Sequence, residues 1–359
     1  MYNIGIVGLG FLGGSLAKSL IATGKVNKII ACDKDMESLK LAQKENVIKD
    51  YSEKIDEKFE DCDIVFICTP VKFIPSIEQE LDKYVNENCI ITDTGSTKKK
   101  IIEQSKKINK EFIGGHPMVG SERSGYKTSK DYLFENAYYI ITKSQNTTKR
   151  AINVLKELII AIGAIPIIID ENKHDYITAT ISHVPHVIAS CLVNLVKQLD
   201  DHDETMKNLA AGGFKDITRI ASADPLMWEN ICSENKEEIL KVLCIFKEIL
   251  NNFEKEISIS DNTFNFFEEA KEYRDSFINK KINGNTMPEL NISIKDENGA
   301  IARIATILSE NNIGMKNIEI LNNRENNYGV LKIVFYSYEQ MEYGYEVLIN
   351  SGYEVKKND

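Results

Sequence analysis

Several features are scarce or missing in this chain of 359 residues, and each absence argues against a class of protein. Basic residues number 44 against 54 acidic ones, and a formal net charge of −10 argues against a nucleic-acid or anionic-membrane binder. The 7 cysteines form no Cys-x-x-Cys pair, so neither a disulfide framework nor a zinc site is expected. The longest apolar run, residues 158–169, is interrupted by Gly163 and Pro166 and is too short for a bilayer. The N-terminus has no basic segment before an apolar one, as a signal peptide would. We expect a reduced, cytoplasmic, multi-domain protein.

The first part of the chain, residues 1–169, predicts an α/β domain of the Rossmann dinucleotide-binding type. Short segments rich in Ile and Val and bounded by Gly, Pro, Asp or Asn are expected to be strands: residues 3–7, 28–33, 63–68, 89–93, 111–114, 137–142 and 164–169. Amphipathic stretches separate the early strands: residues 14–22, 36–45 and 98–108. This alternation predicts right-handed βαβ units and a sheet covered on both faces.

The pattern changes twice after residue 169. Residues 170–282 contain no convincing strand, and 236–257 carries apolar residues at helical spacing, which predicts an all-α second domain. Pro185 is expected to kink or end a helix there. A polar segment follows at residues 279–288. Residues 288–359 then predict the order βαββαβ, which is the ferredoxin-like split motif.

A glycine-rich loop follows the first predicted strand. It reads Gly8-Leu9-Gly10-Phe11-Leu12-Gly13 and opens a helix, which is the context in which this motif binds the pyrophosphate of a dinucleotide. Asp33 ends the second strand 20 residues after Gly13, where a carboxylate would accept a hydrogen bond from the ribose 2′-hydroxyl. That carboxylate would repel a 2′-phosphate, so we expect NAD rather than NADP.

Polar segments that follow strands are the candidates for chemistry. Ser96 lies in Asp-Thr-Gly-Ser-Thr-Lys, where helix capping by Ser96 or Thr97 is the better explanation of the segment taken alone. His116 lies in Gly-Gly-His-Pro-Met, and we expect it in a loop just after a strand. His186 belongs to Ser-His-Val-Pro-His, which lacks the further ligands that a metal site needs. His174 and His202 are expected at the solvated surface.

A further segment runs from two glycines, the second before Phe214, through Arg219 to the only tryptophan, Trp228. An arginine among apolar residues suits the binding of a carboxylate, with the indole as an apolar wall. An arginine paired with Asp216 and a tryptophan in the core between domains explain the segment equally well.

Together these segments resemble the prephenate dehydrogenase family, of the kind that has an NAD-binding domain, a helical dimerisation domain and a C-terminal ACT domain. The resemblance implies that His116 drives the reaction at the C4 hydroxyl of the substrate and that Ser96 hydrogen-bonds His116. It implies that His186 and Arg219 engage the substrate, Arg219 through a carboxylate. Ser121, Glu122, Gly212 and Trp228 fall at positions that line or gate the pocket, and Thr69 and Pro70 join the glycine loop and Asp33 at the cofactor.

The expected reaction is the NAD-dependent oxidative decarboxylation of prephenate to 4-hydroxyphenylpyruvate in tyrosine biosynthesis, by a homodimer or larger homo-oligomer. Asn298, Gly299 and Ala300 resemble the effector loop of ACT domains, with tyrosine as the expected effector; an ordinary loop capped by Asn298 is the alternative. An arogenate dehydrogenase is the nearest rival. A homoserine dehydrogenase would lack the two histidine motifs, and a non-catalytic amino-acid sensor would not need His116, Ser96 and Arg219 together.

Overall fold

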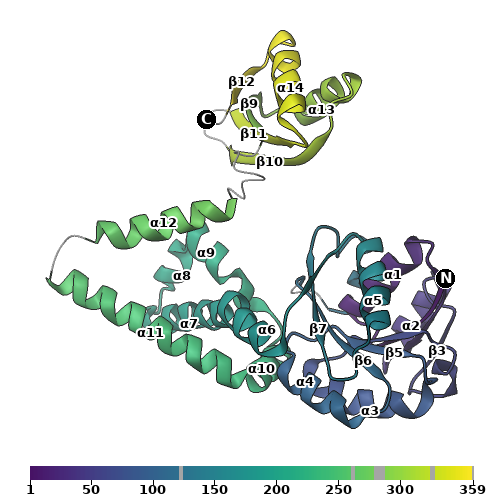
Figure 1. The fold of residues 1–359 in the computed structure, drawn as a ribbon. Helices are drawn as coiled ribbons and strands as arrows, with labels where there is room; N and C mark the ends of the chain where they lie inside the picture. Colours follow the sequence, from purple (N-terminus) through teal and green to yellow (C-terminus); the bar gives the residue numbers. More distant parts are fainter. Residues whose placement is uncertain (121–123, 260–262, 279–287, 324–327, 358–359) are drawn as a thin grey trace. The chain divides into compact units, whose positions relative to one another are not determined.

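The computed structural model describes residues 1–359 except 121–123, 260–262, 279–287, 324–327 and 358–359 (Figure 1). The predicted positions Ser121 and Glu122 therefore lie outside the described residues. The chain divides into two compact units, Met1–Leu250 and Asn251–Asp359. The division expected from the sequence, with domains at 1–169, 170–282 and 288–359, stays a prediction.

An eight-stranded sheet forms the framework of the first unit. Its spatial order is β3-β2-β1-β4-β5-β6-β7-β8. The strands are β1 (Tyr2–Val7), β2 (Val26–Cys32), β3 (Asp50–Ser52), β4 (Ile64–Ile67), β5 (Ile90–Asp93), β6 (Glu111–Pro117), β7 (Tyr138–Lys143) and β8 (Ile165–Ile168). Neighbours pair in parallel except β6 and β7, which are antiparallel. No α-helix lies in the described part of the segment between β6 and β7, so the chain returns without the crossover that parallel pairing needs.

Helices cover both faces of this sheet, as the sequence predicts. The helices are α1 (Phe11–Ala22), α2 (Met36–Lys44), α3 (Ile74–Tyr84), α4 (Lys99–Gln104) and α5 (Lys149–Ala161). One apolar core contains side chains of α1, α2 and α5, and a second contains side chains of α3 and α4. Helix α3 and the short strand β3 were not expected. The double cover leaves the ends of the strands as the place where polar groups can gather.

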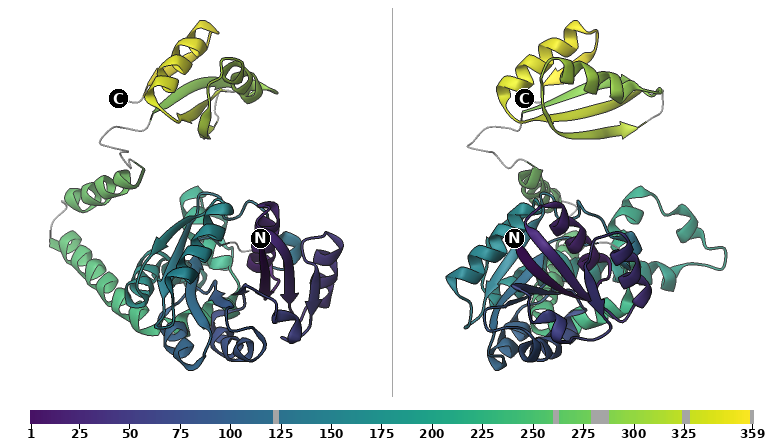
Figure 2. Two further views of the ribbon diagram at one scale, coloured as in Figure 1. Left: turned by 45° about the vertical axis from the view of Figure 1, so that its right-hand side comes forward. Right: turned by 90° about the vertical axis from the view of Figure 1, so that its right-hand side faces the viewer.

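Residues 171–250 are helical, as expected, with no strand among them. The segments are α6 (Glu171–Thr178), a π-helical turn (Ala179–His183), α7 (Val184–Leu199), α8 (Thr205–Leu209), α9 (Gly212–Thr218), a 3-10 turn (Arg219–Ser222), α10 (Pro225–Glu234) and the start of α11 (Lys236–Ile259). These helices are the teal and green ones in Figure 2. Pro185 lies in the first turn of α7 directly after the π-helical turn. Because proline has no N–H and its ring crowds the carbonyl four residues earlier, the wider turn accommodates it without ending the helix.

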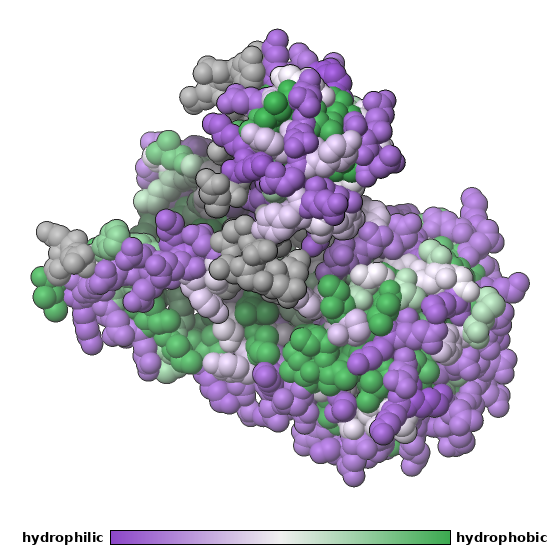
Figure 3. All heavy atoms as spheres, turned by 45° about the horizontal axis from the view of Figure 1, so that its top comes forward, coloured by the Kyte–Doolittle hydropathy of each residue, from purple (hydrophilic) through white to green (hydrophobic). Residues whose placement is uncertain are grey.

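The helical stretch from Glu171 to Leu199 is long and apolar enough to cross a bilayer by length and composition alone. A single helix of this kind is weak evidence for a membrane span, and this one carries three buried histidines of the site described below. Its exposed side chains include Val193, Leu195 and Leu199, and other apolar side chains reach the surface elsewhere (Figure 3).

The second unit contains the end of α11, then α12 (Phe264–Ile278) and a four-stranded antiparallel sheet in the order β10-β11-β9-β12. Its elements after α12 are β9 (Glu289–Lys295), α13 (Ala300–Glu310), β10 (Met315–Asn323), β11 (Tyr328–Phe335), α14 (Tyr338–Asn350) and β12 (Glu354–Lys357). Apolar residues of the strands and of both helices share one core. The order βαββαβ is the one that the sequence predicts.

Candidate active site

The glycine loop has the shape that a dinucleotide requires. Gly8 adopts φ +96°, and a Cβ on Gly13 would lie 1.9 Å from the carbonyl oxygen of Gly8, so neither position accepts a side chain. A Cβ on Gly10 would meet nothing within 4 Å, which leaves open space at the start of α1. No side chain caps that helix, so its first N–H groups are available to an anion. The loop therefore fits the pyrophosphate of a dinucleotide.

Two other predicted cofactor residues lie beside this loop. One carboxylate oxygen of Asp33 accepts a hydrogen bond from the backbone N–H of Leu9 at 2.5 Å, which ties the end of β2 to the loop. A methyl carbon of Thr69 lies 3.0 Å from the Cβ position of Gly8. The buried Thr69 hydroxyl has no hydrogen-bond partner among the described residues, and Pro70 follows it at the surface. Phe11 and Leu12 form the first turn of α1.

A buried ion pair explains the two glycines before His116. Lys98 Nζ lies 2.5 Å from a carboxylate oxygen of Asp93, and both side chains are fully buried. Asp93 also accepts hydrogen bonds from the backbone N–H groups of Gly95 and Gly115. A Cβ on Gly114 would lie 3.0 Å from the Lys98 side chain, and one on Gly115 would lie 2.5 Å from the Asp93 carbonyl oxygen. The glycines let β6 pack against this pair.

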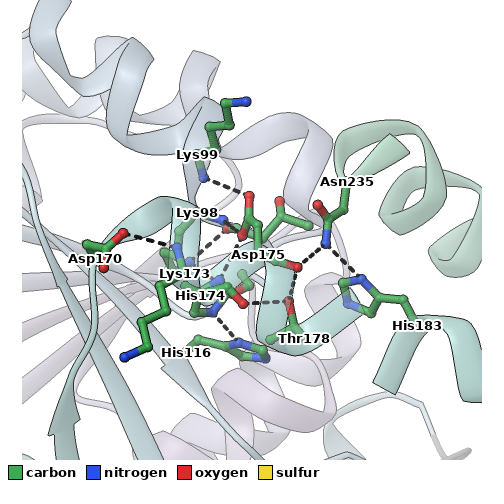
Figure 4. A network of polar contacts seen from close by, with 12 residues as sticks. Lys98, Lys99, His116, Asp170, Lys173, His174, Asp175, Thr178, His183 and Asn235 are labelled. Carbon is green, nitrogen blue, oxygen red and sulfur yellow. Dashed lines mark hydrogen bonds and ion pairs between the residues drawn. The ribbon is translucent and has the colours of Figure 1, made fainter. Parts of the chain in front are cut away.

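His116 forms a chain of hydrogen bonds with two neighbouring residues of α6 (Figure 4). Its Nδ1 lies 2.8 Å from Nε2 of His174, and Nδ1 of His174 lies 2.7 Å from Oδ1 of Asp175. The backbone N–H groups of Lys98 and Lys99 donate to the two oxygens of Asp175 at 2.7 and 3.0 Å. Nε2 of His116 has no partner among the described residues. His116 is partly exposed, so Nε2 is the ring nitrogen that remains for a ligand.

The predictions for two histidines were wrong. His174 is fully buried rather than solvated, because α6 packs its polar face against β6 and the start of α4, where partners are present. His116 belongs to strand β6 rather than to a loop, because β6 continues to Pro117 in its pairing with β7. His202 is exposed, as expected.

Burial and neighbouring charges set the protonation of this cluster. Burial, then the neighbouring His174 and the Lys98 ammonium, lower the pKa of His116 well below its ordinary value. Burial also lowers the pKa of His174, against the effect of Asp175. Burial by itself would raise the pKa of Asp175, but the hydrogen bonds from His174, Lys99 and Lys98 lower it overall. At neutral pH the hydrogen-bond chain therefore consists of two neutral imidazoles, those of His116 and His174, and the carboxylate of Asp175.

His186 and Trp228 form an aromatic pair at the start of α7. Their rings stack with centroids 3.5 Å apart and an angle of 14° between the planes. His183 meets the edge of the same indole, and burial lowers its pKa to about 4. The indole N–H of Trp228 is buried without a hydrogen-bond partner in the described part of the chain. A buried donor of this kind is suited to a polar ligand group.

The remaining predicted residues lie on several elements. Ser96 is partly buried before α4, and no hydrogen bond joins it to His116 in the described structure. Gly212 begins α9, and Arg219 begins the 3-10 turn that packs against α7; both residues are exposed. In the second unit Gly299 adopts φ +82° and forms the N-cap of α13 without a side-chain cap. The cap is therefore Gly299 rather than Asn298.

The carboxyl ends of β1, β4, β5 and β6 lie at one edge of the sheet, because these strands run in parallel. That edge brings together the glycine loop, Thr69, Asp93 and His116. Sequence reasoning missed Asp93, Lys98, His174 and Asp175. Asp93 and Lys98 stood in the Ser96 segment, but the pairing of His174 and Asp175 with His116 had no signal in the sequence. The described residues contain no group of three or more His, Cys, Asp or Glu side chains that could hold a metal ion.

Comparison with known proteins identifies the family of this chain. Residues 16–168 match the family model for the prephenate dehydrogenase nucleotide-binding domain, and residues 170–272 match the model for the dimerization domain. The prephenate dehydrogenase of Bacillus subtilis is 35% identical over 342 residues, which cover 92% of this chain and 91% of that protein. The chain belongs to the prephenate dehydrogenase family.

Two solved structures of related dehydrogenases have a fold similar to that of this chain. The prephenate dehydrogenase of Aquifex aeolicus, in complex with hydroxyphenyl propionate and NAD+, is 34% identical with a TM-score of 0.73. The match covers 77% of this chain and 98% of that one. The arogenate dehydrogenase of Synechocystis is 25% identical with a TM-score of 0.69, and the match covers 77% of this chain and all (100%) of the other.

Proposed function

We propose that this protein oxidises and decarboxylates prephenate to 4-hydroxyphenylpyruvate, the step that precedes transamination to tyrosine. It is an NAD-dependent oxidoreductase, and the glycine loop beside Asp33 and Thr69 fits that cofactor. The observation that carries the proposal is the position of His116 at the edge of the sheet where the glycine loop also lies, with no partner for its Nε2 among the described residues. Burial lowers the pKa of His116 and so favours the neutral ring. A neutral imidazole there is a base for a hydroxyl proton.

The chemistry needs little more than a base and fixed charges. When bound, the nicotinamide ring supplies a hydride acceptor. His116 accepts the proton of the C4 hydroxyl at Nε2 while the hydride leaves C4. The bond between the ring and its carboxylate then breaks as CO2 leaves, the electron pair makes the ring aromatic, and the phenolate oxygen takes the proton back from His116. Prephenate and oxidised NAD thus give 4-hydroxyphenylpyruvate, CO2 and NADH with no net proton released.

The substrate carries two carboxylates, and residues 171–250, the helical part of the first unit, would provide the groups that bind it. Arg219 would bind one carboxylate through its planar guanidinium group. His186 and Trp228, which stack on each other, would form the wall of the pocket, with the unpaired indole N–H as a donor. Ser96 would donate to the substrate hydroxyl, because Nε2 of His116 must stay open to accept the proton. Gly212, Ser121 and Glu122 are proposed to line the entrance.

The test is an assay of NADH formation with prephenate and arogenate side by side. We expect activity on prephenate, and His116→Asn to lower kcat by about 10²–10⁴, the range for a positioned base, while the fold and NAD binding persist. A variant with near-wild-type kcat would contradict the assignment. The similarity to the Synechocystis arogenate dehydrogenase makes arogenate the second candidate, and a higher kcat/KM on arogenate would establish it.

We also propose that the protein is a cytoplasmic homodimer or larger homo-oligomer. The match to a dimerization domain supports this, as do the apolar side chains that α11 leaves exposed at Leu240, Ile245, Ile249 and Leu250. Light scattering after size-exclusion chromatography tests it: a mass near the 40.7 kDa of one chain would contradict the proposal.

Residues 288–359, the part of the second unit that follows α12, are proposed to be an ACT domain that binds an aromatic amino acid, with tyrosine as the expected effector. Its βαββαβ order and the glycine at φ +82° before α13 support this, because Gly299 lets a ligand approach the backbone and Ala300 begins a helix whose N–H groups face it. Calorimetry of tyrosine binding to the full-length wild type and Asn298→Ala tests it. Equal binding and inhibition in both would place the effector site elsewhere.

A further inference from the structure

The hydrogen-bond chain at His116 fixes which nitrogen carries each proton. The carboxylate of Asp175 can only accept, so Nδ1 of His174 donates to it. A neutral His174 then has a bare Nε2, which accepts from the Nδ1–H of His116. A neutral His116 protonated at Nδ1 keeps its lone pair on Nε2, the nitrogen that faces no protein group among the described residues. The order of partners therefore prepares His116 to accept a proton at Nε2.

We infer that His174 and Asp175 are positioning residues that hold His116 in this tautomer and take up part of the charge when it accepts a proton. The inference rests on the proposed function for the identity of the hydroxyl that gives the proton. It does not depend on whether the side chain of the substrate is that of prephenate or of arogenate.

The surroundings hold both residues in place. Both side chains are fully or almost fully buried, at 0% and 1% exposure. Asp175 is fixed by the backbone of Lys98 and Lys99, and its own carbonyl oxygen accepts from the side-chain amide of Asn235 at 2.8 Å. The carboxylate thus has a defined orientation before any substrate arrives. A buried, fully hydrogen-bonded carboxylate of this kind orients an imidazole more rigidly than solvent can.

The charged neighbours explain why a carboxylate is needed. Lys98 lowers the pKa of both His116 and His174, and the neighbouring His183 also lowers that of His116. Asp93, the partner of Lys98, raises the pKa of His174 together with Asp175. A proton that arrives at His116 enters a site with little capacity for positive charge. Asp175 is the carboxylate that is hydrogen-bonded directly to His174, so it can stabilise a positive charge on the two imidazoles.

His116, His174 and Asp175 form a proton relay that takes up and returns one proton without exchange with solvent. When Nε2 of His116 takes the substrate proton, its Nδ1 proton can move to Nε2 of His174, which becomes an imidazolium ion paired with Asp175. When the phenolate forms, the same proton shifts run in reverse and the product oxygen receives a proton. The reaction releases no net proton, so the relay needs to hold one proton only for the lifetime of the ketone intermediate.

Two variants of His174 separate its possible roles. In His174→Asn the amide can still donate to Asp175, but no acceptor remains for the Nδ1–H of His116. In His174→Gln the amide oxygen can accept from His116, but the residue cannot take up a proton. We expect kcat to fall about 10²–10³-fold in His174→Asn, which loses the tautomer control, and about 10-fold in His174→Gln, with KM for the substrate little changed.

The pH profile distinguishes positioning from simple structural support. His174 lowers the pKa of His116 only when His174 is itself charged. A single proton can be shared between the two rings, and in His174→Gln only His116 can hold it, so the acid limb of kcat should move about one unit to lower pH. Thr178→Val is the matched control, because Thr178 donates to the carbonyl oxygen of His174 on the same helix. It should lower the melting temperature and leave the acid limb in place. A loss of kcat in His174→Gln that is equal at every pH, or the same shift in Thr178→Val, would refute the relay.

A measurement without substrate keeps this inference separate from the proposed reaction. The chain has 5 histidines, so ¹⁵N NMR of histidine-labelled full-length protein gives few signals, and the His116→Asn variant identifies those of His116. We expect the Nδ1-protonated tautomer in the wild type and its loss in His174→Asn. The Nε2-protonated tautomer in the wild type would overturn the inference even if prephenate is oxidised. The expected tautomer would support it even if both substrates fail.

Discussion

Glu78 offers a quantitative test of how the core of the first unit handles charge. It lies on α3 at 0% exposure, and neither carboxylate oxygen has a hydrogen-bond partner among the described residues. Burial, and to a smaller extent the negative charge of Asp93, raise the pKa of Glu78 from 4.5 to about 9 despite Lys98. The residue is therefore protonated in the folded protein at pH 7 and ionised in the unfolded chain.

This difference lowers stability as pH rises. The raised pKa means that the contribution of Glu78 to stability is complete below pH 4.5 and is lost progressively up to about pH 9. At pH 7 the loss is about 3 kcal/mol, because each unit above the unfolded pKa corresponds to about 1.4 kcal/mol. Glu78→Gln removes the titration, so it should raise the melting temperature at pH 7 by about 6 °C or more, since about 1 kcal/mol corresponds to about 2–4 °C in a unit of this size.

Scanning calorimetry at several values between pH 5 and 8 measures this effect. The difference in melting temperature between Glu78→Gln and the wild type should grow with pH and be small at pH 5. Glu80→Gln is the control, because Glu80 is exposed on the same helix. A difference that does not change with pH would show that Glu78 is not held protonated, and the account of its burial would be wrong.

Three further predictions concern the site. The wild type should use NAD far more efficiently than NADP, and Asp33→Asn should narrow the ratio of the two kcat/KM values; equal values in the wild type would show that Asp33 does not face the 2′-position. Arg219→Ala should weaken substrate binding by about 2–5 kcal/mol in steady-state kinetics while cofactor affinity barely changes, and an unchanged KM would make Arg219 structural. Gly115→Ala should lower kcat at least about 10-fold in the NADH assay. The new Cβ would lie 2.5 Å from the Asp93 carbonyl oxygen, so β6 and His116 must move. A wild-type kcat would show that β6 accommodates the side chain without displacing His116.

Local sequence patterns determined much of this protein. The glycine loop between a strand and a helix, with Asp33 at the end of the next strand, needs only neighbouring residues to define it. The same holds for the βαββαβ order of the second unit, where alternating and helical apolar periods follow each other within short segments. His116 was identifiable because two glycines and a proline surround it. These features depend on backbone conformation and periodicity, which a short stretch of chain specifies.

The tertiary structure decided the rest. His174 and His116 are 58 residues apart, and nothing near His174 in the sequence indicates that α6 packs it against the end of β6. The sequence around Glu78 does not indicate that its side chain is buried; the packing of α3 against the sheet buries it. The antiparallel direction of β7 depends on the path of the chain after Pro117. In each case the environment of a polar group is set by elements distant in sequence, because burial and hydrogen-bond partners depend on packing rather than on local conformation.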